Sequence, residues 1–576
     1  MSSKPRIGVY ICHCGINIAA TVDITAVTQH AANLPGVIVS RDYTYMCSDP
    51  GQALIKQDIA ELELNRVVVA SCSPRMHEPT FRATIAEAGL NPYCFEMANI
   101  REQCSWVHAG NAETTRKAID LVTSAVVKAA QLEPLQERQV PVTPSALVIG
   151  GGVSGMQAAL DIADAGFQVT LVEREPNLGG RAAQLFKTFP TLEPGADIAQ
   201  SLIDAVSNHS GIKVLTNAQL VDVNGYIGNF KASVLVNENR LDVLVGTIVV
   251  ASGYQIFDAR RKPELGYGVY PEVITTWELE KLFQQEGIIN DREPKRVVFI
   301  QCVGSRDQTV GNPYCSRICC MVTAKQARLI RQKFPNAQVT VFYMDVRAYG
   351  KGFEEFYDKA REDGVIYRRG NPSEIIRRED RLVVRAEDTL LGEPIELETD
   401  LVVLAVGMEP DHQSESVSGL LKLARSTDGF FLEAHPKLRP VETATAGVYL
   451  AGCCQGPKDL AESINQARAA AATAMIPLMR GEVPVDAATS FIEEELCSGC
   501  GQCAEVCTYS ALSLHPVRKV MTVNAVLCQG CGACAATCPS GAINVRQFTF
   551  SQFMAQIEAF SDSWELLERA IDFEKV

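Results

Sequence analysis

The sequence contains no long apolar run and no excess of positive charge. Its 68 Asp and Glu residues outnumber its 53 Lys and Arg residues, and the net charge is −15. Proteins that bind nucleic acid concentrate basic side chains against phosphate, so this balance argues against such a partner. No apolar stretch approaches the roughly eighteen residues that a membrane helix needs, and the first residues lack the pattern of a signal peptide. We therefore expect a cytoplasmic protein with no membrane span and no nucleic-acid partner.

Cysteine, by contrast, is abundant, with 20 residues in a chain of 576. In a protein without an export signal, this number favours metal or redox sites over structural disulfides. Strand-like runs alternate with helical patterns such as residues 111–130, which is typical of multidomain α/β proteins. The expected segments are 1–130, 145–290 together with 390–480, 291–389, 490–546, and a helical tail at 547–576.

Two cysteine runs in the 490–546 segment share one spacing, C-x2-C-x2-C-x3-C, and the second run ends in Cys538-Pro539. This is the spacing of bacterial two-cluster ferredoxins, in which the fourth cysteine of each run binds the other cluster. A zinc module is the alternative, because four-cysteine zinc sites also use C-x2-C. Two complete runs favour an α+β ferredoxin domain with two [4Fe–4S] clusters. One cluster is assigned to Cys497, Cys500, Cys503 and Cys538, and the other to Cys528, Cys531, Cys534 and Cys507.

A glycine-rich turn follows the linker at 131–145. The stretch SALVIGGGVSGMQAALDIADAGFQVTLVER begins as a strand, opens a helix at Gly150-x-Gly152-x-x-Gly155 and ends a second strand at Glu173. The glycines permit a tight turn and close approach of a pyrophosphate to the helix N-terminus. An acidic residue at the end of the second strand suits an adenosine ribose. This order of elements predicts a dinucleotide-binding unit rather than only a glycine-rich turn.

The rest of this segment is similar to the FAD domains of two-dinucleotide-domain flavoproteins such as thioredoxin reductase. The similarity rests on LVEREPNLGGRAAQ, GTIVVASGY, TDLVVLAVGMEPD and GVYLAGCCQGPKD, and it implies the same fold with bound FAD. In that family the last stretch usually reads Ala-Gly-Asp. Here it reads Ala451-Gly452-Cys453, so Asp459 or the following helix is expected to replace the missing aspartate. The implied FAD contacts are Gly150, Gly152, Gly155, Glu173, Arg174, Gly180, Arg181, Gly253, Gly452 and Asp459.

The second nucleotide-type segment, 291–389, lacks a glycine fingerprint. In PKRVVFIQCVGSRD (294–307) the strand is present, but Gly304 stands alone behind Cys302. A dinucleotide fold is thus expected without its phosphate cradle, and direct use of NAD(P)H is not expected. The competing interpretation is an NAD(P)H-dependent FAD and iron–sulfur oxidoreductase like the small subunit of glutamate synthase.

Four cysteines lie where that cradle is lost. Cys302 ends a strand, whereas Cys315, Cys319 and Cys320 surround the start of the next helix. A dithiol exchange site normally has C-x-x-C, which is absent, and a vicinal disulfide or simple packing is the alternative to a cluster. We predict a [4Fe–4S] cluster beside the flavin. Lys325, on the same helix, is expected near the flavin ring, where its charge stabilises the reduced flavin; the alternative is a solvated helix lysine.

Taken together, these features resemble the A subunit of heterodisulfide reductase (HdrA) over nearly the whole chain. The most specific stretches are CHCGINIAA, YMCSDPGQ, RVVVASCSPRMHEPTF, NPYCFEMANIREQCSWVH and AGCCQGPKD. The resemblance implies a flavin-bearing subunit of a cytoplasmic complex that splits electron pairs between ferredoxin and a disulfide (electron bifurcation). A scaffold that transfers electrons without bifurcation is the alternative. The implied partners are the B and C subunits, a hydrogenase, formate dehydrogenase or NADH-oxidising module, ferredoxin, and a second copy of the chain.

The resemblance also implies a [4Fe–4S] cluster in the N-terminal segment. We favour Cys14, Cys47, Cys72 and Cys104 as its ligands, with Cys12 as a competitor and buried free thiols as the alternative. Methanogen members carry an inserted ferredoxin-like module before the GTIVVASG-like strand, but residues 214–245 of this chain contain no cysteine. The expected cofactors are therefore FAD and about four [4Fe–4S] clusters. Cys94 and the Cys453-Cys454 pair are expected to pack without binding a cluster.

Overall fold

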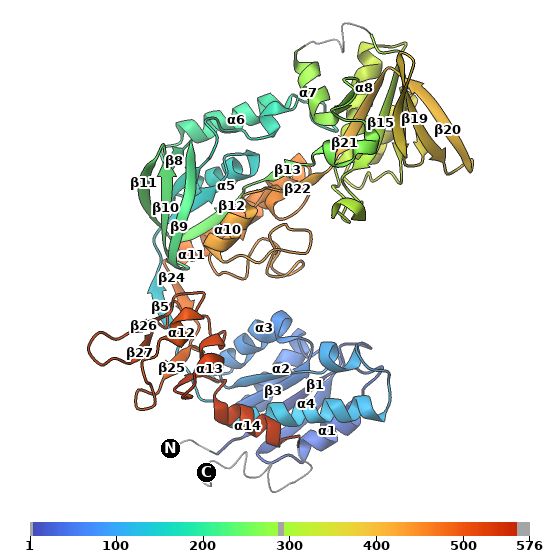
Figure 1. Cartoon of the computed structure of the whole chain (residues 1–576). Helices are drawn as coiled ribbons and strands as arrows, with labels where there is room; N and C mark the ends of the chain where they lie inside the picture. Colours follow the sequence, from blue (N-terminus) through green and yellow to red (C-terminus); the bar gives the residue numbers. More distant parts are fainter. Residues whose placement is uncertain (1–3, 286–292, 561–576) are drawn as a thin grey trace. The chain divides into compact units, whose positions relative to one another are not determined.

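The computed structural model describes residues 4–285 and 293–560. The chain divides into two compact units, Met1–Gln139 with Pro484–Val576, and Val140–Val483 (Figure 1). The boundaries fall in strands β5 (Arg138–Pro141) and β24 (Glu482–Val485). Within the described residues, no helix is both long enough and apolar enough to cross a membrane.

The N-terminal part of the first unit is a parallel sheet with strand order β2-β1-β3-β4, flanked by helices. Strands β1 and β3 are continuous apolar runs and are almost completely buried, as expected for parallel strands covered on both faces. Because the C-terminal ends of parallel strands meet at one edge, the loops after β1, β2 and β3 converge there. The elements are β1 (Ile7–Cys12), α1 (Ile24–Ala32), β2 (Val37–Tyr43), α2 (Asp49–Glu61), β3 (Arg66–Ser71), α3 (Pro74–Glu87), β4 (Phe95–Asn99) and α4 (Ala112–Ala130).

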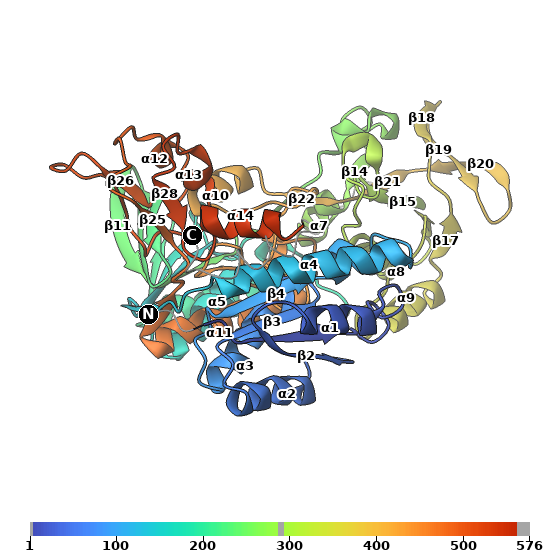
Figure 2. The same ribbon diagram turned by 90° about the horizontal axis from the view of Figure 1, so that it is seen from below.

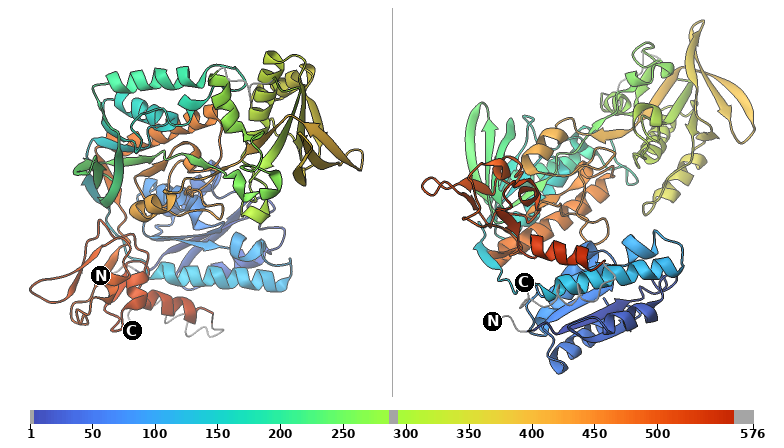
Figure 3. Two further views of the ribbon diagram at one scale, coloured as in Figure 1. Left: turned by 45° about the horizontal axis from the view of Figure 1, so that its top comes forward. Right: turned by 60° about the horizontal axis from the view of Figure 1, so that its bottom comes forward.

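The remainder of the first unit is a module of short elements. Strand β25 pairs antiparallel with β28, and β26 pairs antiparallel with β27. The helix that follows, α14, lies along α4 (Figures 2 and 3). Its Ala555, together with Ala559 just after its last residue, is buried in the core of the N-terminal sheet domain. The elements are β25 (Ser490–Ile492), α12 (Gln502–Glu505), β26 (Leu512–Leu514), β27 (Met521–Val523), α13 (Ala533–Thr537), β28 (Ile543–Val545) and α14 (Phe550–Glu558).

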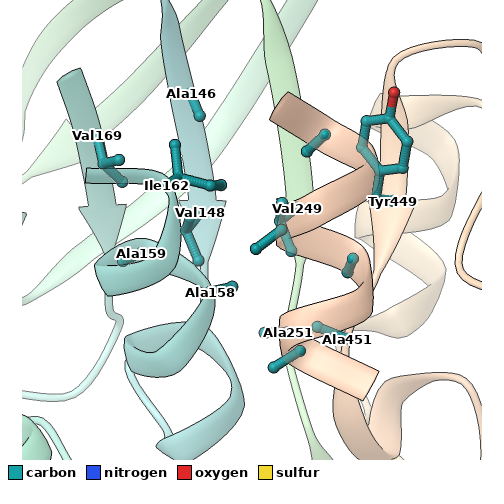
Figure 4. Close-up of a cluster of buried hydrophobic side chains, with 14 of the residues drawn as sticks. Ala146, Val148, Ala158, Ala159, Ile162, Val169, Val249, Ala251, Tyr449 and Ala451 are labelled. Atoms are coloured by element: carbon teal, nitrogen blue, oxygen red, sulfur yellow. The ribbon is translucent and has the colours of Figure 1, made fainter. Parts of the chain in front are cut away.

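The second unit contains two halves, each built on a five-stranded parallel sheet. In the first half the order is β23-β12-β6-β7-β8. Figure 4 shows its core, where Ile162 of α5 lies against Val148 of β6 and Val249 of β12 lies close to the alanine-rich helix α11. An antiparallel sheet, β9 to β11, is also present. The elements are β6 (Ser145–Ile149), α5 (Val153–Asp164), β7 (Gln168–Val172), α6 (Gly195–Asn208), β8 (Ile212–Leu215), β9 (Ala218–Tyr226), β10 (Asn229–Val236), β11 (Asn239–Val245), β12 (Thr247–Val250), α10 (Ser414–Leu421), β23 (Val448–Leu450) and α11 (Leu460–Arg480).

The second half has strand order β14-β21-β15-β16-β17, with an antiparallel sheet of β18 to β20 attached. Antiparallel strands β13 and β22 connect the two halves. The elements are β13 (Tyr254–Ile256), β14 (Val273–Thr275), α7 (Thr276–Gln284), β15 (Arg296–Val303), α8 (Cys319–Lys333), β16 (Gln338–Tyr343), α9 (Phe353–Glu362), β17 (Ile366–Arg369), β18 (Glu374–Arg378), β19 (Arg381–Asp388), β20 (Glu393–Thr399), β21 (Leu401–Val406) and β22 (Met408–Pro410).

Candidate flavin and iron–sulfur sites

A cavity of about 720 Å³ lies between the two halves of the second unit. Its wall contains the glycine turn after β6, the end of β7, the first turn and a half of α8, and the start of α11. A cavity of this size, with one end at a glycine turn and the other at the second half, has the volume and shape that an extended dinucleotide needs.

The geometry of the turn after β6 gives each of its three glycines a separate role. Gly150 has φ +111°, and a Cβ atom there would come within 2.3 Å of the Ala251 carbonyl oxygen. A Cβ atom on Gly155 would come within 1.8 Å of the Gly150 carbonyl oxygen, whereas one on Gly152 would meet no protein atom within 4 Å. Gly152 lines the cavity at the start of α5, so the turn leaves open space for a phosphate at the helix N-terminus.

Acidic and basic side chains surround the adenosine end of the cavity. Glu173 Oε2 accepts a hydrogen bond from Gly151 N–H at 2.6 Å, which fixes the carboxylate at the end of β7. Arg174 forms a 3.1 Å ion pair with the buried Asp411. The carboxylate of Glu173 and the guanidinium of Arg174 both line the cavity, where they can recognise a ribose and a phosphate.

Arg181 lies near the middle of the cavity. Its Nε donates to the Tyr254 carbonyl oxygen at 3.1 Å, and its guanidinium lies 5.0 Å from the Tyr254 ring centroid and 5.6 Å from that of Trp277. Gly180 and Gly253 both have positive φ and line the cavity. These residues form a continuous lining from the glycine turn toward the second half.

Ala451 and Cys453 of the A-G-C stretch line the cavity, whereas Gly452 between them does not. Gly452 has φ +73°, and the Cys453 thiol donates to the Lys458 carbonyl oxygen at 3.5 Å. Asp459 is buried and caps α11, because its Oδ1 accepts from Glu462 N–H at 2.8 Å. The capping bond and the positive end of the α11 dipole both lie at the cavity wall, in the place where the sequence predicts a replacement for the missing aspartate.

Lys325 lines the cavity from α8 and is only 1% exposed. Its Nζ lies 2.6 Å from Glu280 Oε1 and donates to the Lys187 carbonyl oxygen at 2.6 Å. The alternative of a solvated helix lysine is therefore wrong. Glu280 also accepts from Phe186 N–H at 3.0 Å and from Gln326, so a buried network holds the Lys325 ammonium group in place.

The structure brings the four central cysteines together. A register shift in β15 places Cys302 in the left-handed region, with φ +59°, and turns it toward the start of α8, where Cys319 and Cys320 lie. Burial, with the neighbouring Cys320, raises the pKa of Cys302 to about 12. Burial and the other three thiols also raise the pKa of Cys319, which lines the flavin cavity.

The closeness of these four thiols fits a cluster site, whereas a raised pKa alone does not, because burial also raises the pKa of the packed Cys94 and Cys454. Four thiolates cannot coexist in a buried position without positive charge between them, and iron supplies that charge. Backbone N–H groups already point at two of the sulfurs, from Arg317 to Cys315 at 3.3 Å and from Arg347 to Cys320 at 3.4 Å. Such donors stabilise cluster thiolates.

In the N-terminal domain, Cys12, Cys14, Cys47 and Cys72 gather at the sheet edge where the loops converge. Cys12 Sγ accepts from the N–H groups of Cys14 at 3.3 Å and Met46 at 3.5 Å. Burial raises the pKa of Cys72 to about 11, with Cys14 among the neighbours that add to the effect. The nearby thiols of Cys14 and Cys47 likewise act to raise the pKa of Cys12.

Cys104 does not join this group, contrary to the expected ligand set. The short π-helix at Arg101–Ser105 turns its thiol toward the Thr114 carbonyl oxygen, at 3.2 Å, within the core under α4. The charge near Cys104 is that of Lys117, which acts to lower the pKa of its thiol. Near Cys12, the thiols of Cys14 and Cys47 both act to raise its pKa. The structure thus places the competitor Cys12, rather than Cys104, with the other three.

The cysteines of the last module lie close together, and Cys534 of one assigned set is itself a neighbour of Cys503 of the other. A small cavity is lined by the four cysteines that the sequence assigns to one cluster. In the other group, Cys528 and Cys531 are the charged neighbours of Cys534, and Cys507 and Cys531 are those of Tyr509. The cavity-lining set is Cys497, Cys500, Cys503 and Cys538.

Among the described residues, no three His, Cys, Asp or Glu side chains lie close enough together to hold a single metal ion. A four-iron cluster requires a wider arrangement, because each of its thiolates bonds a different iron atom.

Comparison with known sequences identifies the family. The pyridine nucleotide-disulphide oxidoreductase family matches residues 144–474 (and 110–265), and the 4Fe-4S dicluster domain matches residues 496–542. An iron-sulfur A subunit of the CoB–CoM heterodisulfide reductase of Methanopyrus kandleri is 47% identical, over 89% of this chain and 91% of its own length. The chain belongs to the HdrA family, the A subunits of heterodisulfide reductase.

Other members of the family extend this result. The A subunit of the H(2):CoB-CoM heterodisulfide,ferredoxin reductase of Methanothermobacter thermautotrophicus is 46% identical over 96% of this chain and 97% of its own length. Among solved structures, thioredoxin reductase of T. acidophilum aligns with 59% of this chain and 99% of its own, at 18% identity and a TM-score of 0.41. The predicted family, the flavoprotein fold with a ferredoxin-type module and the oxidoreductase class are confirmed. The two family matches imply a flavin and 4Fe-4S clusters.

Proposed function

We propose that this chain is the electron-distributing subunit of a cytoplasmic heterodisulfide-reductase-like complex, in which FAD occupies the 720 Å³ cavity and four [4Fe–4S] clusters occupy the cysteine groups. The ferredoxin-type module holds two clusters, as the sequence assigns them. The central cluster is held by Cys302, Cys315, Cys319 and Cys320, and the N-terminal cluster by Cys12, Cys14, Cys47 and Cys72.

The position of Cys319 is the observation that carries this proposal. It lines the flavin cavity on the side of the second half, at the start of α8, where a nicotinamide-binding domain would present its glycine turn. Three further cysteines gather behind it. A cluster at this place can exchange single electrons with the flavin, whereas a hydride donor would have no phosphate cradle.

FAD supplies the ability to take up an electron pair and release its electrons one at a time. The residues of this chain bind and orient the cofactor: the glycine turn receives the pyrophosphate, Glu173 the ribose, and the N-terminus of α11 the ribityl chain. Lys325 brings a buried positive charge to the cavity, and Glu280 fixes its position. The aromatic rings of Trp277 and Tyr254 belong to residues that also line the cavity.

The name of one relative favours bifurcation. The Methanothermobacter protein described above is named as an H(2):heterodisulfide,ferredoxin reductase, whereas a Methanosarcina acetivorans relative is named as dependent on ferredoxin or F(420)H(2). We propose a two-electron donor for this chain, with ferredoxin and a disulfide as acceptors. The B and C subunits, an input module such as a hydrogenase, formate dehydrogenase or NADH-oxidising module, and a second copy of the chain complete the proposed complex.

This chain lacks a stretch of residues that the methanogen proteins contain. The alignments with the two Methanothermobacter relatives extend over 643 positions, more than the 576 residues of this chain, so those relatives contain inserted residues. In this chain residues 218–245 form the plain antiparallel sheet β9 to β11, without cysteine.

Iron analysis and reduction of the purified chain test the proposal. We expect about sixteen irons and one FAD per chain, bleaching of the flavin by dithionite, and no bleaching by NADPH. Cys319→Ser is expected to remove about four irons, whereas Cys94→Ser, at a buried cysteine outside the groups, keeps them all. Flavin reduction by NADPH would favour the glutamate-synthase-like alternative, and an iron count near eight would remove both unusual clusters.

A further inference from the structure

One charged side chain donates a hydrogen bond directly to a thiol of the N-terminal cysteine group. Arg101 opens the π-helix after β4 and is 9% exposed. Its Nη1 donates to Cys14 Sγ at 3.1 Å, and its Nη2 donates to Met76 Sδ at 3.1 Å. Both contacts direct the guanidinium toward the sulfur atoms rather than toward solvent.

Two neighbours hold the guanidinium in this orientation. Glu102 Oε1 accepts from Arg101 Nη2 at 2.6 Å and from its Nε at 3.2 Å, and the Trp106 ring centroid lies 4.6 Å from Arg101 Cζ. The second oxygen of Glu102 is buried and has no hydrogen-bond partner in the described part of the chain. The charge of Glu102 also acts to raise the pKa of Cys72, whereas the charge of Arg101 acts to lower it. Another titratable neighbour is His77, a side chain on α3 whose pKa is lowered by burial and by Arg101.

The other cysteine groups have weaker donors. In the central group, Arg306 lies near the thiols, but its guanidinium forms a 2.6 Å ion pair with Asp345, and backbone N–H groups contact the sulfurs. In the ferredoxin-type module the sulfurs contact backbone N–H groups and the Ser490 hydroxyl. A guanidinium bonded to a thiolate sulfur is a charge-assisted contact, roughly twice as strong as a neutral hydrogen bond.

We propose that Arg101 and Glu102 are positioning residues that set the reduction potential of the N-terminal cluster in opposite directions. This inference rests on the proposed function, because it requires a cluster at this cysteine group. Reduction adds one electron, and therefore one negative charge, to the cluster and its four thiolates. The guanidinium stabilises that charge and raises the potential, whereas the carboxylate of Glu102 opposes it and lowers the potential.

A redox titration of the full-length, cluster-loaded chain, followed by electron paramagnetic resonance with dithionite as reductant, tests the inference. The signal of the N-terminal cluster is first identified as the one that Cys47→Ser removes and Cys94→Ser keeps. We expect Arg101→Gln to shift this signal to a lower midpoint potential and Glu102→Gln to shift it to a higher one. Arg101→Lys, which keeps the positive charge, should leave the midpoint potential close to that of the wild type. Arg6→Gln, at an arginine before β1 and so at the opposite edge of the sheet from the cysteines, should leave the potential unchanged.

The outcomes separate this inference from the proposed function. If no signal depends on Cys47, the N-terminal cluster of the proposed function is absent and the inference fails with it. If such a signal exists but neither glutamine variant moves its midpoint, or both move it in the same direction, only the inference is overturned. Should Arg101→Gln lose the cluster, the upward shift expected for Glu102→Gln decides the question alone.

Discussion

At the scale of single residues, the buried pair of Lys325 and Glu280 predicts a pH dependence of stability. Neither side chain is more than 2% exposed. Burial lowers the pKa of Lys325, although Glu280 acts to raise it. A lysine whose pKa is lowered by folding binds its proton more tightly in the unfolded chain, so it opposes folding at neutral pH. The free energy of unfolding therefore rises as the pH increases from the lowered pKa to the ordinary lysine value.

We expect Lys325→Met alone to lower the free energy of unfolding by about 3–5 kcal/mol, because it leaves the carboxylate of Glu280 buried without the positive charge that balances it. The double variant Lys325→Met with Glu280→Leu should be as stable as the wild type, or more stable, at pH 7. Its advantage should shrink as the pH approaches the ordinary lysine pKa. Denaturant unfolding at several pH values measures both effects, and a double variant no more stable than the single one would contradict the explanation.

The sequence alone identifies residues whose spacing is characteristic of a site. It does not identify residues that come together only in the folded chain. The glycines at 150, 152 and 155 and the two ferredoxin runs have such spacings, and the structure assembles both. Glu280 reaches Lys325 from another helix, so no local pattern pairs them. The sequence does not distinguish Cys12 from Cys104 as a cluster ligand. The structure does, because the π-helix after β4 turns the Cys104 thiol toward the Thr114 carbonyl oxygen.

At the scale of elements, the docking of α14 on α4 is a test of how the ferredoxin-type module is attached. Ala555 is buried in the N-terminal core, and Gln552 Nε2 donates to the Gln131 carbonyl oxygen at 3.0 Å. We expect Ala555→Asp to destabilise this contact by at least about 2 kcal/mol, because it buries an unpaired carboxylate. Hydrogen exchange should then accelerate in α4. Phe550→Asp, on the same helix but 70% exposed, is the control, and equal exchange in both variants would contradict the assignment.

The longer elements were predictable and the shorter ones were not. β1 and β3 are continuous apolar runs, and the helical pattern at 111–130 is confirmed as α4, Ala112–Ala130. These elements are specified by their own hydrophobic pattern. The strands and helices of the ferredoxin-type module have only three to five residues each, too few for a periodic signal, and the predicted helical tail falls partly outside the described residues.

At the scale of the whole molecule, the ferredoxin-type module is expected to depend on iron for its stability more than the rest of the chain does. The second unit has large cores of aliphatic and aromatic side chains, and the N-terminal sheet domain is likewise built on aliphatic residues. The ferredoxin-type module has a core of Cys503, Leu512, Met521, Cys534 and Ile543, two of which are assigned cluster ligands. A core this small cannot offset the chain entropy of the module without further support.

Removal of iron by a chelator under reducing conditions should therefore unfold the module while leaving most of the chain folded. The reason is that metal binding supplies folding free energy where no preformed core exists. We expect hydrogen exchange at residues 490–546 to become fast in the iron-free chain, while β6, β12 and β15 stay protected and FAD stays bound. Reconstitution with iron and sulfide should restore protection. If residues 490–546 remained protected without iron, the module would be stabilised by protein contacts such as that of α14 with α4, and the clusters would only occupy a fold that already exists.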